Sequence, residues 1–226
     1  MSGSLSGVHV DEALLLQPAE LVTRLRTLKA DQPPLILIGN RCELASMLTK
    51  QMLHQFLPQE ERSRIEEFFH LADQQRFVIG RSILRAILGH WFSIEPSSVA
   101  ITLSTYGKPY CENAPFFNIS HSGDYIVLAI HPSRKAGIDV EQVQHYKEWK
   151  GMAAMLWPEI VTKHIESFPV HSQSTEFLNQ WCQYEALTKA YGLGLSAQWE
   201  KIASEKPCHL WKLSLPETYL GYAAML

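Results

Sequence analysis

The chain has 226 residues, of which 46% are hydrophobic, and its formal net charge is −3, so it can bury one large core or two smaller ones without disulfides. The weak negative charge argues against a broadly basic nucleic-acid-binding protein, and the longest apolar runs are far shorter than the roughly 20 residues of a membrane span. The N-terminal sequence lacks the basic and apolar segments of a secretory signal, so we expect a cytoplasmic protein.

Short runs of β-branched and aromatic residues predict strands, and apolar residues at i, i+3 and i+4 spacing predict helices. In chain order these are a strand at Leu35–Ile38, a helix at Phe77–Trp91, strands at Val99–Leu103, Phe116–Ile119 and Tyr125–Ile130, a helix at Thr175–Tyr191 and a strand at Tyr219–Leu226. We expect Ser174 to cap the start of the second helix and Gly192 to cap its end. Because the helices do not alternate one-to-one with strands, the pattern predicts an α+β fold.

A turn-rich segment at residues 132–137 is the best candidate for a hinge, which divides the chain into residues 1–136 and 137–226. The four cysteines are widely scattered and form no CxxC motif: Cys42, Cys111, Cys182 and Cys208. We therefore expect reduced cysteines that serve mostly to fill the core.

Gly107, Lys108 and Pro109 follow the predicted strand at Val99–Leu103. Pro109 disfavours a helical conformation at Lys108, so we expect this lysine to lie in an extended loop. Taken alone, the segment is an ordinary turn that carries one cation.

The next polar motif is Ser120-His121-Ser122-Gly123, which follows the apolar residues of a predicted strand. If these residues form a tight turn, their backbone N–H groups, hydroxyls and imidazole could hold a phosphate. The alternative is an ordinary hairpin turn. A hydrolase nucleophile is disfavoured because Ser120 and His121 are adjacent and the chain has no G-x-S-x-G elbow at this point.

The sequence Gly137-Ile-Asp-Val-Glu141 alternates as a short strand does, so Asp139 and Glu141 should point to the same face. Two such carboxylates repel unless a cation or a proton lies between them. Their hard oxygens suit Mg²⁺. The alternative is a solvated strand edge.

On the helix around residues 178–189, Glu185 and Lys189 share a stripe with Leu178, Trp181 and Cys182. Burying charged groups on such a stripe costs several kcal/mol unless they find partners. A simple i, i+4 ion pair is the alternative, but it does not explain the apolar neighbours.

In combination, the four motifs resemble those of the 4′-phosphopantetheinyl transferases, specifically the longer surfactin-synthetase-activating type. The matching segments are Gly107-Lys108-Pro109, Asn118 to Gly123, Gly137 to Glu141, and Trp181 to Leu195 with its Glu185, Lys189, Gly192 and Gly194. The resemblance spans about residues 60–196, and the first fifty or so residues carry no matching motif.

The resemblance implies two similar α+β halves related by a pseudo-twofold axis, with coenzyme A in the cleft between them. It implies an enzyme that uses Mg²⁺, with Mn²⁺ as the alternative ion, to transfer the phosphopantetheine arm of coenzyme A. The acceptor is a serine of an apo acyl or peptidyl carrier protein, and the second product is 3′,5′-ADP. A monomer is expected because one chain carries both halves, and neither nucleic acid nor a membrane is an expected partner.

The resemblance also assigns roles to individual residues. The metal-ligand positions are those of Asp139, Glu141 and Glu185. Lys189 is expected at the pyrophosphate, and either Glu185 or a metal-bound water takes the proton of the acceptor serine. The expected contacts to coenzyme A are Ser120 and His121 at phosphates, Gly107, Lys108 and Pro109 along the adenine, and Arg64 and Arg76 at the 3′-phosphate, with Arg62 as an alternative to either arginine.

One position departs from the family pattern, because the family commonly has lysine where this chain has Tyr184. Tyr184 either packs in the core or alters substrate handling, and we expect Tyr184→Lys to keep or raise activity. It is also the only support for an alternative function, a coenzyme-A-binding or carrier-binding module without transferase activity. A phosphodiesterase is a second alternative. Arg81 and Arg85 share a helix face that could meet an acidic carrier.

Overall fold

The computed structural model of the protein describes residues 4–11, 14, 18–47, 55–193 and 209–226. Gly194, Leu195 and Cys208, which the sequence analysis considered, lie outside the described residues. The three described cysteines, Cys42, Cys111 and Cys182, are free thiols.

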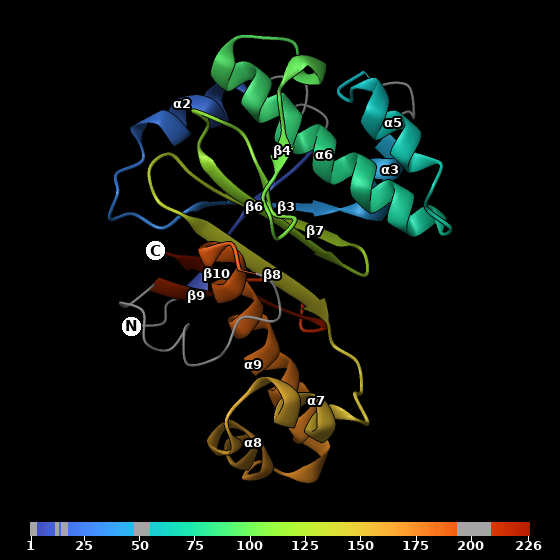
Figure 1. Ribbon diagram of the computed structural model, residues 1–226, viewed down its shortest axis with the longest axis vertical. Helices are drawn as coiled ribbons and strands as arrows, with labels where there is room; N and C mark the ends of the chain where they lie inside the picture. The colour runs from blue at the N-terminus through green and yellow to red at the C-terminus, as the bar shows by residue number, and fades with distance from the viewer. Residues whose placement is uncertain (1–3, 12–13, 15–17, 48–54, 194–208) are drawn as a thin grey trace.

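Two four-stranded sheets form the centre of the molecule (Figure 1). The first has the order β2-β3-β7-β6 and consists of β2 (Val8–His9), β3 (Leu35–Asn40), β7 (Tyr125–His131) and β6 (Phe116–Ser122). The second has the order β1-β9-β10-β8 and consists of β1 (Ser4–Leu5), β9 (His209–Leu213), β10 (Tyr219–Met225) and β8 (Ala136–Gln142). Only the short pairs β1/β9 and β2/β3 are parallel among the described strands. A small hairpin joins β4 (Thr102–Leu103) to β5 (Pro109–Tyr110).

Helices cover the outer faces of both sheets (Figure 1). On the side of the first sheet lie α2 (Ala19–Thr27), α3 (Arg41–Met47), α5 (Gln59–Ile65) and α6 (Leu71–Phe92). On the side of the second sheet lie α7 (Trp149–Leu156), α8 (Glu159–Glu166) and α9 (Val170–Tyr191). The resulting order is helix, sheet, sheet, helix.

The apolar run in β3 explains this layering. Leu35 and Leu37 pack in the cluster that contains α6, whereas Ile36 and Ile38 pack in the cluster between the two sheets. Both faces of β3 are therefore buried, which accounts for a strand without polar alternation. The inter-sheet cluster also contains Ile138 and Val140 of β8. The opposite face of β8 is thus left for Asp139, Glu141 and α9.

The predicted α+β class is confirmed, and the elements differ from the prediction in three places. The second long helix begins at Val170 after Pro169, not at Thr175. Ser174 is buried inside this helix, where its hydroxyl accepts the amide of Tyr146 at 2.7 Å instead of capping the helix. The predicted strand at Val99–Leu103 shrinks to β4, preceded by a 3₁₀ turn at Pro96–Ser98. The expected cap at Gly192 is confirmed by its left-handed φ of +73°.

The third difference concerns Ser120, His121 and Ser122, which we expected in a tight turn. They continue β6 and pair with Val127, Ile126 and Tyr125 of β7. The chain does turn nearby, at Gly123. However, the three residues belong to a β ladder, so the expectation that a tight turn leaves their backbone N–H groups for a phosphate is wrong. The hydroxyls and the imidazole must therefore provide any contact to a ligand.

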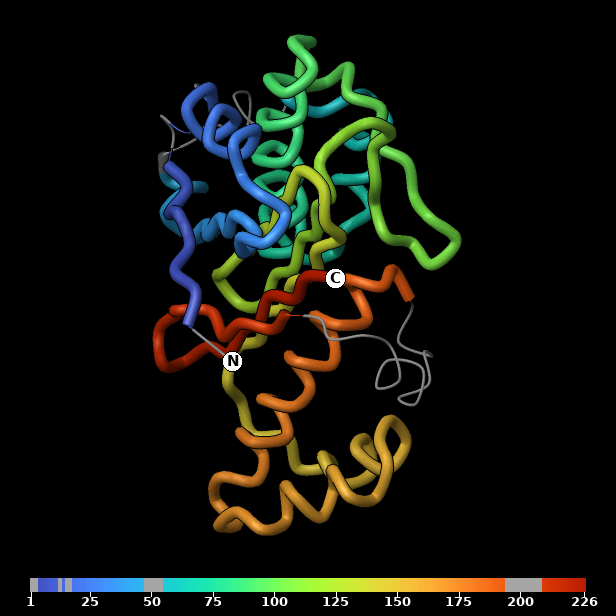
Figure 2. The backbone as a smooth tube through the Cα atoms, turned by 90° about the vertical axis from the view of Figure 1, so that its left-hand side faces the viewer, coloured from blue at the N-terminus to red at the C-terminus, as the bar shows by residue number. Residues whose placement is uncertain are grey.

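The predicted boundary between residues 136 and 137 falls at the first residue of β8. All the helices of the second layer follow this point, but β1 does not, because Ser4–Leu5 pairs with Lys212–Leu213 of β9. Figure 2 shows this blue N-terminal segment beside the red C-terminal strands. The division into two domains and the pseudo-twofold relation stay predictions. Among the described helices, none is both long and apolar enough to cross a membrane.

Candidate functional site

The edge strands of the two sheets, β6 and β8, are joined by polar side chains of β6. The Oδ1 atom of Asn118 accepts the amide of Ile138 at 2.8 Å. The hydroxyl of Ser120 donates to Oδ1 of Asp139 at 2.9 Å, and that of Ser122 donates to Oε2 of Glu141 at 2.8 Å. Residues 118, 120 and 122 alternate along a strand and therefore point to one face. This ladder connects the sheets and orients both carboxylates.

Helix α9 lies very close to β8 at Gly137. A Cβ atom at this position would lie 2.0 Å from the carbonyl oxygen of Ala186 and 2.3 Å from the amide nitrogen of Ala190. Only glycine permits this approach of a helix to a strand backbone. The approach brings the last two turns of α9, with Glu185 and Lys189, over the carboxylates of β8.

Lys189 lies between two of the predicted metal ligands. Its Nζ is 2.6 Å from Oδ1 of Asp139 and 3.4 Å from Oε2 of Glu185. Asp139 is 2% exposed and Glu185 is 7% exposed, so these charges are removed from bulk water. The sequence prediction of buried charges with partners is confirmed for Glu185, whereas Lys189 has the expected partners but its side chain is 28% exposed. We call Asp139, Glu141, Glu185 and Lys189 the carboxylate cluster.

Burial and mutual repulsion shift the pKa values within the carboxylate cluster. Burial raises the pKa of Glu185, and Asp139 raises it further, although Lys189 acts in the opposite direction. Burial and the charge of Asp139 raise the pKa of Glu141, while the hydrogen bond from Ser122 lowers it. Burial alone would lower the pKa of Lys189, but the two neighbouring carboxylates more than offset it and the pKa is raised. Three carboxylates face one ammonium, which favours a further cation.

Two orphaned oxygen atoms bear on whether a metal ion fits. Oδ2 of Asp139 and Oε1 of Glu185 are buried and have no hydrogen-bond partner. Carboxylate oxygens are the ligands that Mg²⁺ prefers, so the donor chemistry fits this ion. Among the described residues, however, no three Asp, Glu, His or Cys side chains are gathered in the geometry of a metal site. In this arrangement the ammonium of Lys189 provides the positive charge.

A cavity of about 360 Å³ lies where α5, α6, the β4–β5 hairpin and β6 meet. Its walls include three arginines, one histidine, and a glycine and a proline of the β4–β5 hairpin, namely Arg64, Arg76, Arg81, His121, Gly107 and Pro109. The structure thus brings together five residues that the resemblance assigned to coenzyme A: Arg64, Arg76, Gly107, Pro109 and His121. We call this space the cationic cavity.

The arginine side chains of this cavity are held by contacts with neighbouring protein groups. Arg76 donates to Asp73 at 2.5 Å and to the carbonyl of Gly123 at 2.7 Å. The guanidinium groups of Arg64 and Arg81 lie 5.3 and 5.8 Å from the ring centre of Phe77. Arg81 is also 3.6 Å from a carboxylate oxygen of Glu61, so the positive charge left toward the cavity is chiefly that of Arg64.

His121 enters the cationic cavity from β6. His121 keeps solvent exposure, but partial desolvation by the surrounding protein lowers the pKa of its imidazole, and the neighbouring Arg76 lowers it further. The ring is therefore neutral near pH 7, so one of its nitrogens carries a hydrogen and can donate to an anion. Because residues alternate along β6, Ser120 faces the carboxylate cluster and His121 faces the cationic cavity.

Two arginines considered in the sequence analysis are engaged elsewhere. Arg62 donates from Nε to the carbonyl of Leu57 at 2.8 Å and does not line the cationic cavity. Arg85 is 3% exposed and binds Glu61 and the carbonyl of Val99, so it cannot present a face to a carrier protein. Arg81 was missed as a cavity residue, since its spacing on the helix indicated only a shared face with Arg85.

Lys108 also differs from the expectation for its side chain. Its ammonium does not line the cationic cavity but donates to the carbonyls of Ala136 and Lys189 at 3.0 and 2.5 Å. Burial, with a smaller contribution from Lys135, lowers the pKa of Lys108 to about 8. The backbone of residues 107–109 remains the predicted adenine contact.

Tyr184 is a core residue. It is 1% exposed, and its ring lies 6.0 Å from that of Trp157 in an edge-to-face arrangement within the cluster formed by α7, α8 and α9. The interpretation of Tyr184 as a packing residue is confirmed. The expectation that Tyr184→Lys keeps or raises activity stays a prediction, and the burial adds a cost in stability, because the change would place an ammonium among aromatic side chains.

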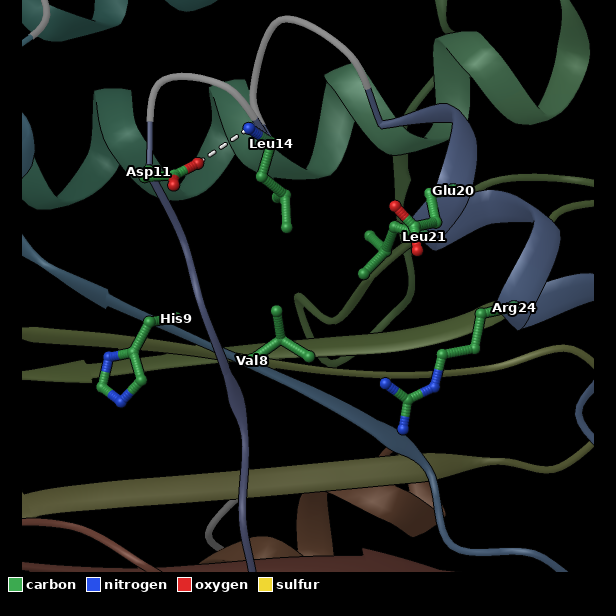
Figure 3. Close-up of a pocket in the computed structure, with 7 residues that line it drawn as sticks. All are labelled: Val8, His9, Asp11, Leu14, Glu20, Leu21 and Arg24. Atoms are coloured by element: carbon green, nitrogen blue, oxygen red, sulfur yellow. Dashed lines mark hydrogen bonds between the residues drawn. The ribbon is translucent and has the colours of Figure 1, made fainter.

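A second cavity, of about 490 Å³, lies between β2 and α2 (Figure 3). Figure 3 shows the side chains of His9, Asp11, Glu20 and Arg24 around it, together with apolar groups. The carboxylate of Asp11 already accepts the amide of Leu14 at 2.8 Å. None of the residues that line this cavity was predicted as a site residue, and the charges of both signs around it favour no one class of ligand.

Two family models match the chain. One describes the N-terminal part of 4′-phosphopantetheinyl transferases and matches residues 46–133, and the other describes the 4′-phosphopantetheinyl transferase superfamily and matches residues 135–212. The chain is also similar to the 4′-phosphopantetheinyl transferase HetI of a Nostoc species, with 30% identity over 145 residues that cover 62% of this chain and 61% of the relative. The 4′-phosphopantetheinyl transferase Sfp of Bacillus subtilis is 27% identical over 143 residues, which cover 62% of each chain. A phosphopantetheinyl transferase of a Thraustochytrium species is 29% identical over 65% of this chain and 56% of its own. The matches thus span less than two thirds of these relatives.

Proposed function

The chain belongs to the 4′-phosphopantetheinyl transferase superfamily, in its surfactin-synthetase-activating type, and from this we propose that it transfers the 4′-phosphopantetheine group of coenzyme A to a serine of an apo acyl or peptidyl carrier protein. The second product is 3′,5′-ADP. The observation that carries this proposal is the contact of Lys189 on α9 with Asp139 on β8 at 2.6 Å. The same two elements hold Glu185 and Glu141, and β6, which borders β8, also lines the cationic cavity.

The cationic cavity is the proposed site of the 3′-phosphate of coenzyme A. Arg64 and Arg76 supply the charge, and guanidinium groups suit phosphate because they donate two parallel hydrogen bonds. His121 supplies a further N–H donor at the same phosphate. Gly107 and Pro109, which also line the cavity, are the proposed contacts to the adenine.

The residues proposed to hold Mg²⁺, or alternatively Mn²⁺, are Asp139, Glu141 and Glu185. When bound, the ion neutralises the carboxylates and makes the phosphorus more electrophilic. The two buried oxygen atoms without partners, on Asp139 and Glu185, support this assignment. Ser120 and Ser122 orient Asp139 and Glu141 through the hydrogen bonds from β6.

In the reaction, the serine oxygen of the carrier forms a bond to the phosphorus on the pantetheine side, and the bond from this phosphorus to the bridging oxygen breaks. Glu185 is the proposed acceptor of the serine proton, because it is buried at the site beside Lys189 and its Oε1 atom has no hydrogen-bond partner. Lys189 neutralises the charge that develops on the leaving diphosphate oxygen.

We test the proposal with the full chain, coenzyme A, Mg²⁺ and a panel of apo carrier proteins, and we weigh the carriers by mass spectrometry. The expected result is a mass gain of one phosphopantetheine group on at least one carrier, and its loss when the carrier serine is replaced by alanine. Binding of coenzyme A without any mass gain would support the inactive-module alternative. Cleavage of coenzyme A without a carrier would instead support a phosphodiesterase.

The alternative of an inactive binding module has lost its one support. Tyr184 suggested a defective site, but its burial against Trp157 explains it as a core residue. We also propose that the enzyme acts as a monomer, since one chain carries both the cationic cavity and the carboxylate cluster. Sedimentation at working concentration tests this.

A further inference from the structure

Lys108 extends from a closed loop between β4 and β5. The amide of Gly107 donates to the carbonyl of Ser104 at 2.9 Å, and the amide of Ser104 donates to the carbonyl of Lys108 at 2.8 Å. The amide of Lys108 in turn donates to the hydroxyl of Ser104 at 3.1 Å. Gly107 has a left-handed φ of +77°, which this tight loop requires. The side chain of Lys108 therefore starts from a fixed backbone.

The side chain of Lys108 ends on two elements of the carboxylate cluster. Its ammonium donates to the carbonyl of Ala136, the first residue of β8, and to the carbonyl of Lys189, in the last turn of α9. Its Cδ atom also lies 3.8 Å from the position that a Cβ atom on Gly192, the cap of α9, would occupy. The carbonyl of Lys189 also accepts the amide of Gly192 at 3.2 Å, so the ammonium is a second donor to it, and a cation at the C-terminal end of a helix is favourable.

We propose that Lys108 is a positioning residue, whose ammonium ties the C-terminal turn of α9 to the start of β8 and so holds Lys189 against Asp139. The same residue, Lys189, accepts from Lys108 through its carbonyl and contacts Asp139 through its ammonium. The neighbours Gly107 and Pro109 line the cationic cavity, so one loop contacts both parts of the site. The inference rests on the proposed function, because it assigns Lys108 a role in that reaction.

A positioning role and a nucleotide-contact role predict different kinetics. If the ammonium contacted the adenine, its loss would raise the KM for coenzyme A and leave kcat nearly unchanged. If it positions α9, its loss should lower kcat and leave the Kd for coenzyme A nearly unchanged. A displacement of about 1 Å at a catalytic group can reduce the rate about 100-fold.

The experiment compares Lys108→Met, Lys108→Arg and a control, Lys163→Met, on the exposed face of α8, where the lysine side chain is 68% exposed. We expect Lys108→Met to lower kcat about 10- to 100-fold with the Kd for coenzyme A within about twofold. Lys108→Arg, which can still donate to both carbonyls, should recover most of kcat, and the control should match the native protein. Hydrogen exchange of the last turn of α9 should become about tenfold faster in Lys108→Met alone.

An unchanged kcat in Lys108→Met overturns the inference, and so does a raised Kd for coenzyme A with kcat retained. Unchanged hydrogen exchange at the end of α9 overturns it as well. If the native protein transfers nothing to any carrier, the proposed function fails, and the exchange measurement alone then decides whether Lys108 holds α9. Circular dichroism of each variant confirms that the protein compared is folded.

Discussion

The carboxylate cluster and the cationic cavity lie on opposite faces of β6, and they hold their charges in different ways. In the cluster, Asp139 has donors from Ser120 and Lys189, so its charge is largely compensated inside the protein. In the cavity, Arg64 lies over an aromatic ring, and Arg76 has one carboxylate partner that is itself partly exposed. Asp139 is thus already held by internal partners, whereas the cavity retains positive charge for an incoming anion.

This difference implies a division of labour within one site. Groups that are buried and fixed by internal hydrogen bonds can stabilise a transition state without reorganising, so changes in the cluster should lower the rate of transfer. Charges that await a ligand contribute chiefly to its binding, so changes in the cavity should weaken affinity for coenzyme A.

The largest effect is expected for Asp139→Ala. It removes the partner of Lys189 and one proposed metal ligand, so we expect transfer to fall by at least about 1,000-fold while the fold is retained. Asp139→Ala removes both the negative charge beside Lys189 and the acceptor of the Ser120 hydroxyl. Asp139→Asn is the matched variant, because it removes the charge and keeps an acceptor oxygen for Ser120. Mass spectrometry of the carrier measures the rate, and Glu159→Ala on the exposed surface of α8 is the control. Near-normal labelling by both Asp139 variants would refute the metal assignment.

Tyr184→Lys tests whether a loss of stability can be separated from a change in the carboxylate cluster. Among the aromatic side chains of Trp157 and Phe177 an ammonium would find no partner from these rings, so we expect the free energy of unfolding to fall by about 2–4 kcal/mol. Denaturant titration measures this loss, and Tyr184→Phe, which keeps the ring, should cost much less. Activity above that of the native protein, at native stability, would restore the interpretation of Tyr184 as a substrate-handling residue.

A third prediction concerns Arg76→Met in the cationic cavity. Loss of one charged hydrogen bond to phosphate should raise the KM for coenzyme A about 10- to 100-fold and change kcat little. With dephospho-coenzyme A, which lacks the 3′-phosphate, native protein and variant should be nearly equal. Arg62→Met is the matched control, because Arg62 binds the carbonyl of Leu57 outside the cavity. If kcat falls and KM does not change, the division between rate and affinity is wrong.

The sequence was most informative where function requires a specific residue type at fixed spacing. Strand alternation placed Asp139 and Glu141 on one face, and helical spacing placed Glu185 and Lys189 on an apolar stripe. Both arrangements are local, so periodicity captures them. Their convergence was available only from the resemblance, because it depends on the close approach of α9 to β8 at Gly137.

Other features depend on tertiary contacts that periodicity does not encode. Ser174 has the chemistry of an N-cap, but its hydroxyl accepts an amide from Tyr146, 28 residues away, inside a longer helix. The motif at Ser120 suggested a turn because it is polar, whereas β7 extends the strand through it by pairing. The parallel pairing of β1 with β9 joins residues at opposite ends of the chain and leaves no local signal.

The smallest effect is expected for Glu141→Gln, and it distinguishes stability from catalysis inside the cluster. Burial and Asp139 raise the pKa of Glu141, so the folded protein binds this proton more tightly than the unfolded chain does. Its contribution to stability is therefore complete below the ordinary glutamate pKa of 4.5 and is lost as pH rises through the raised value.

In metal-free protein at pH 7, Glu141→Gln should consequently be more stable than the native chain by about 1 kcal/mol or less, because solvent screens part of the repulsion. This advantage should vanish below about pH 4.5, where the native carboxyl is protonated.

Mg²⁺ should stabilise the native protein more than the variant, while transfer by the variant is slower. Denaturant titrations at both pH values, with and without the ion, measure the stability effects, and carrier labelling measures the rate. A variant that is less stable at pH 7 without metal would mean that the hydrogen bond from Ser122 outweighs repulsion from Asp139, so that Glu141 belongs to the scaffold that joins β6 to β8.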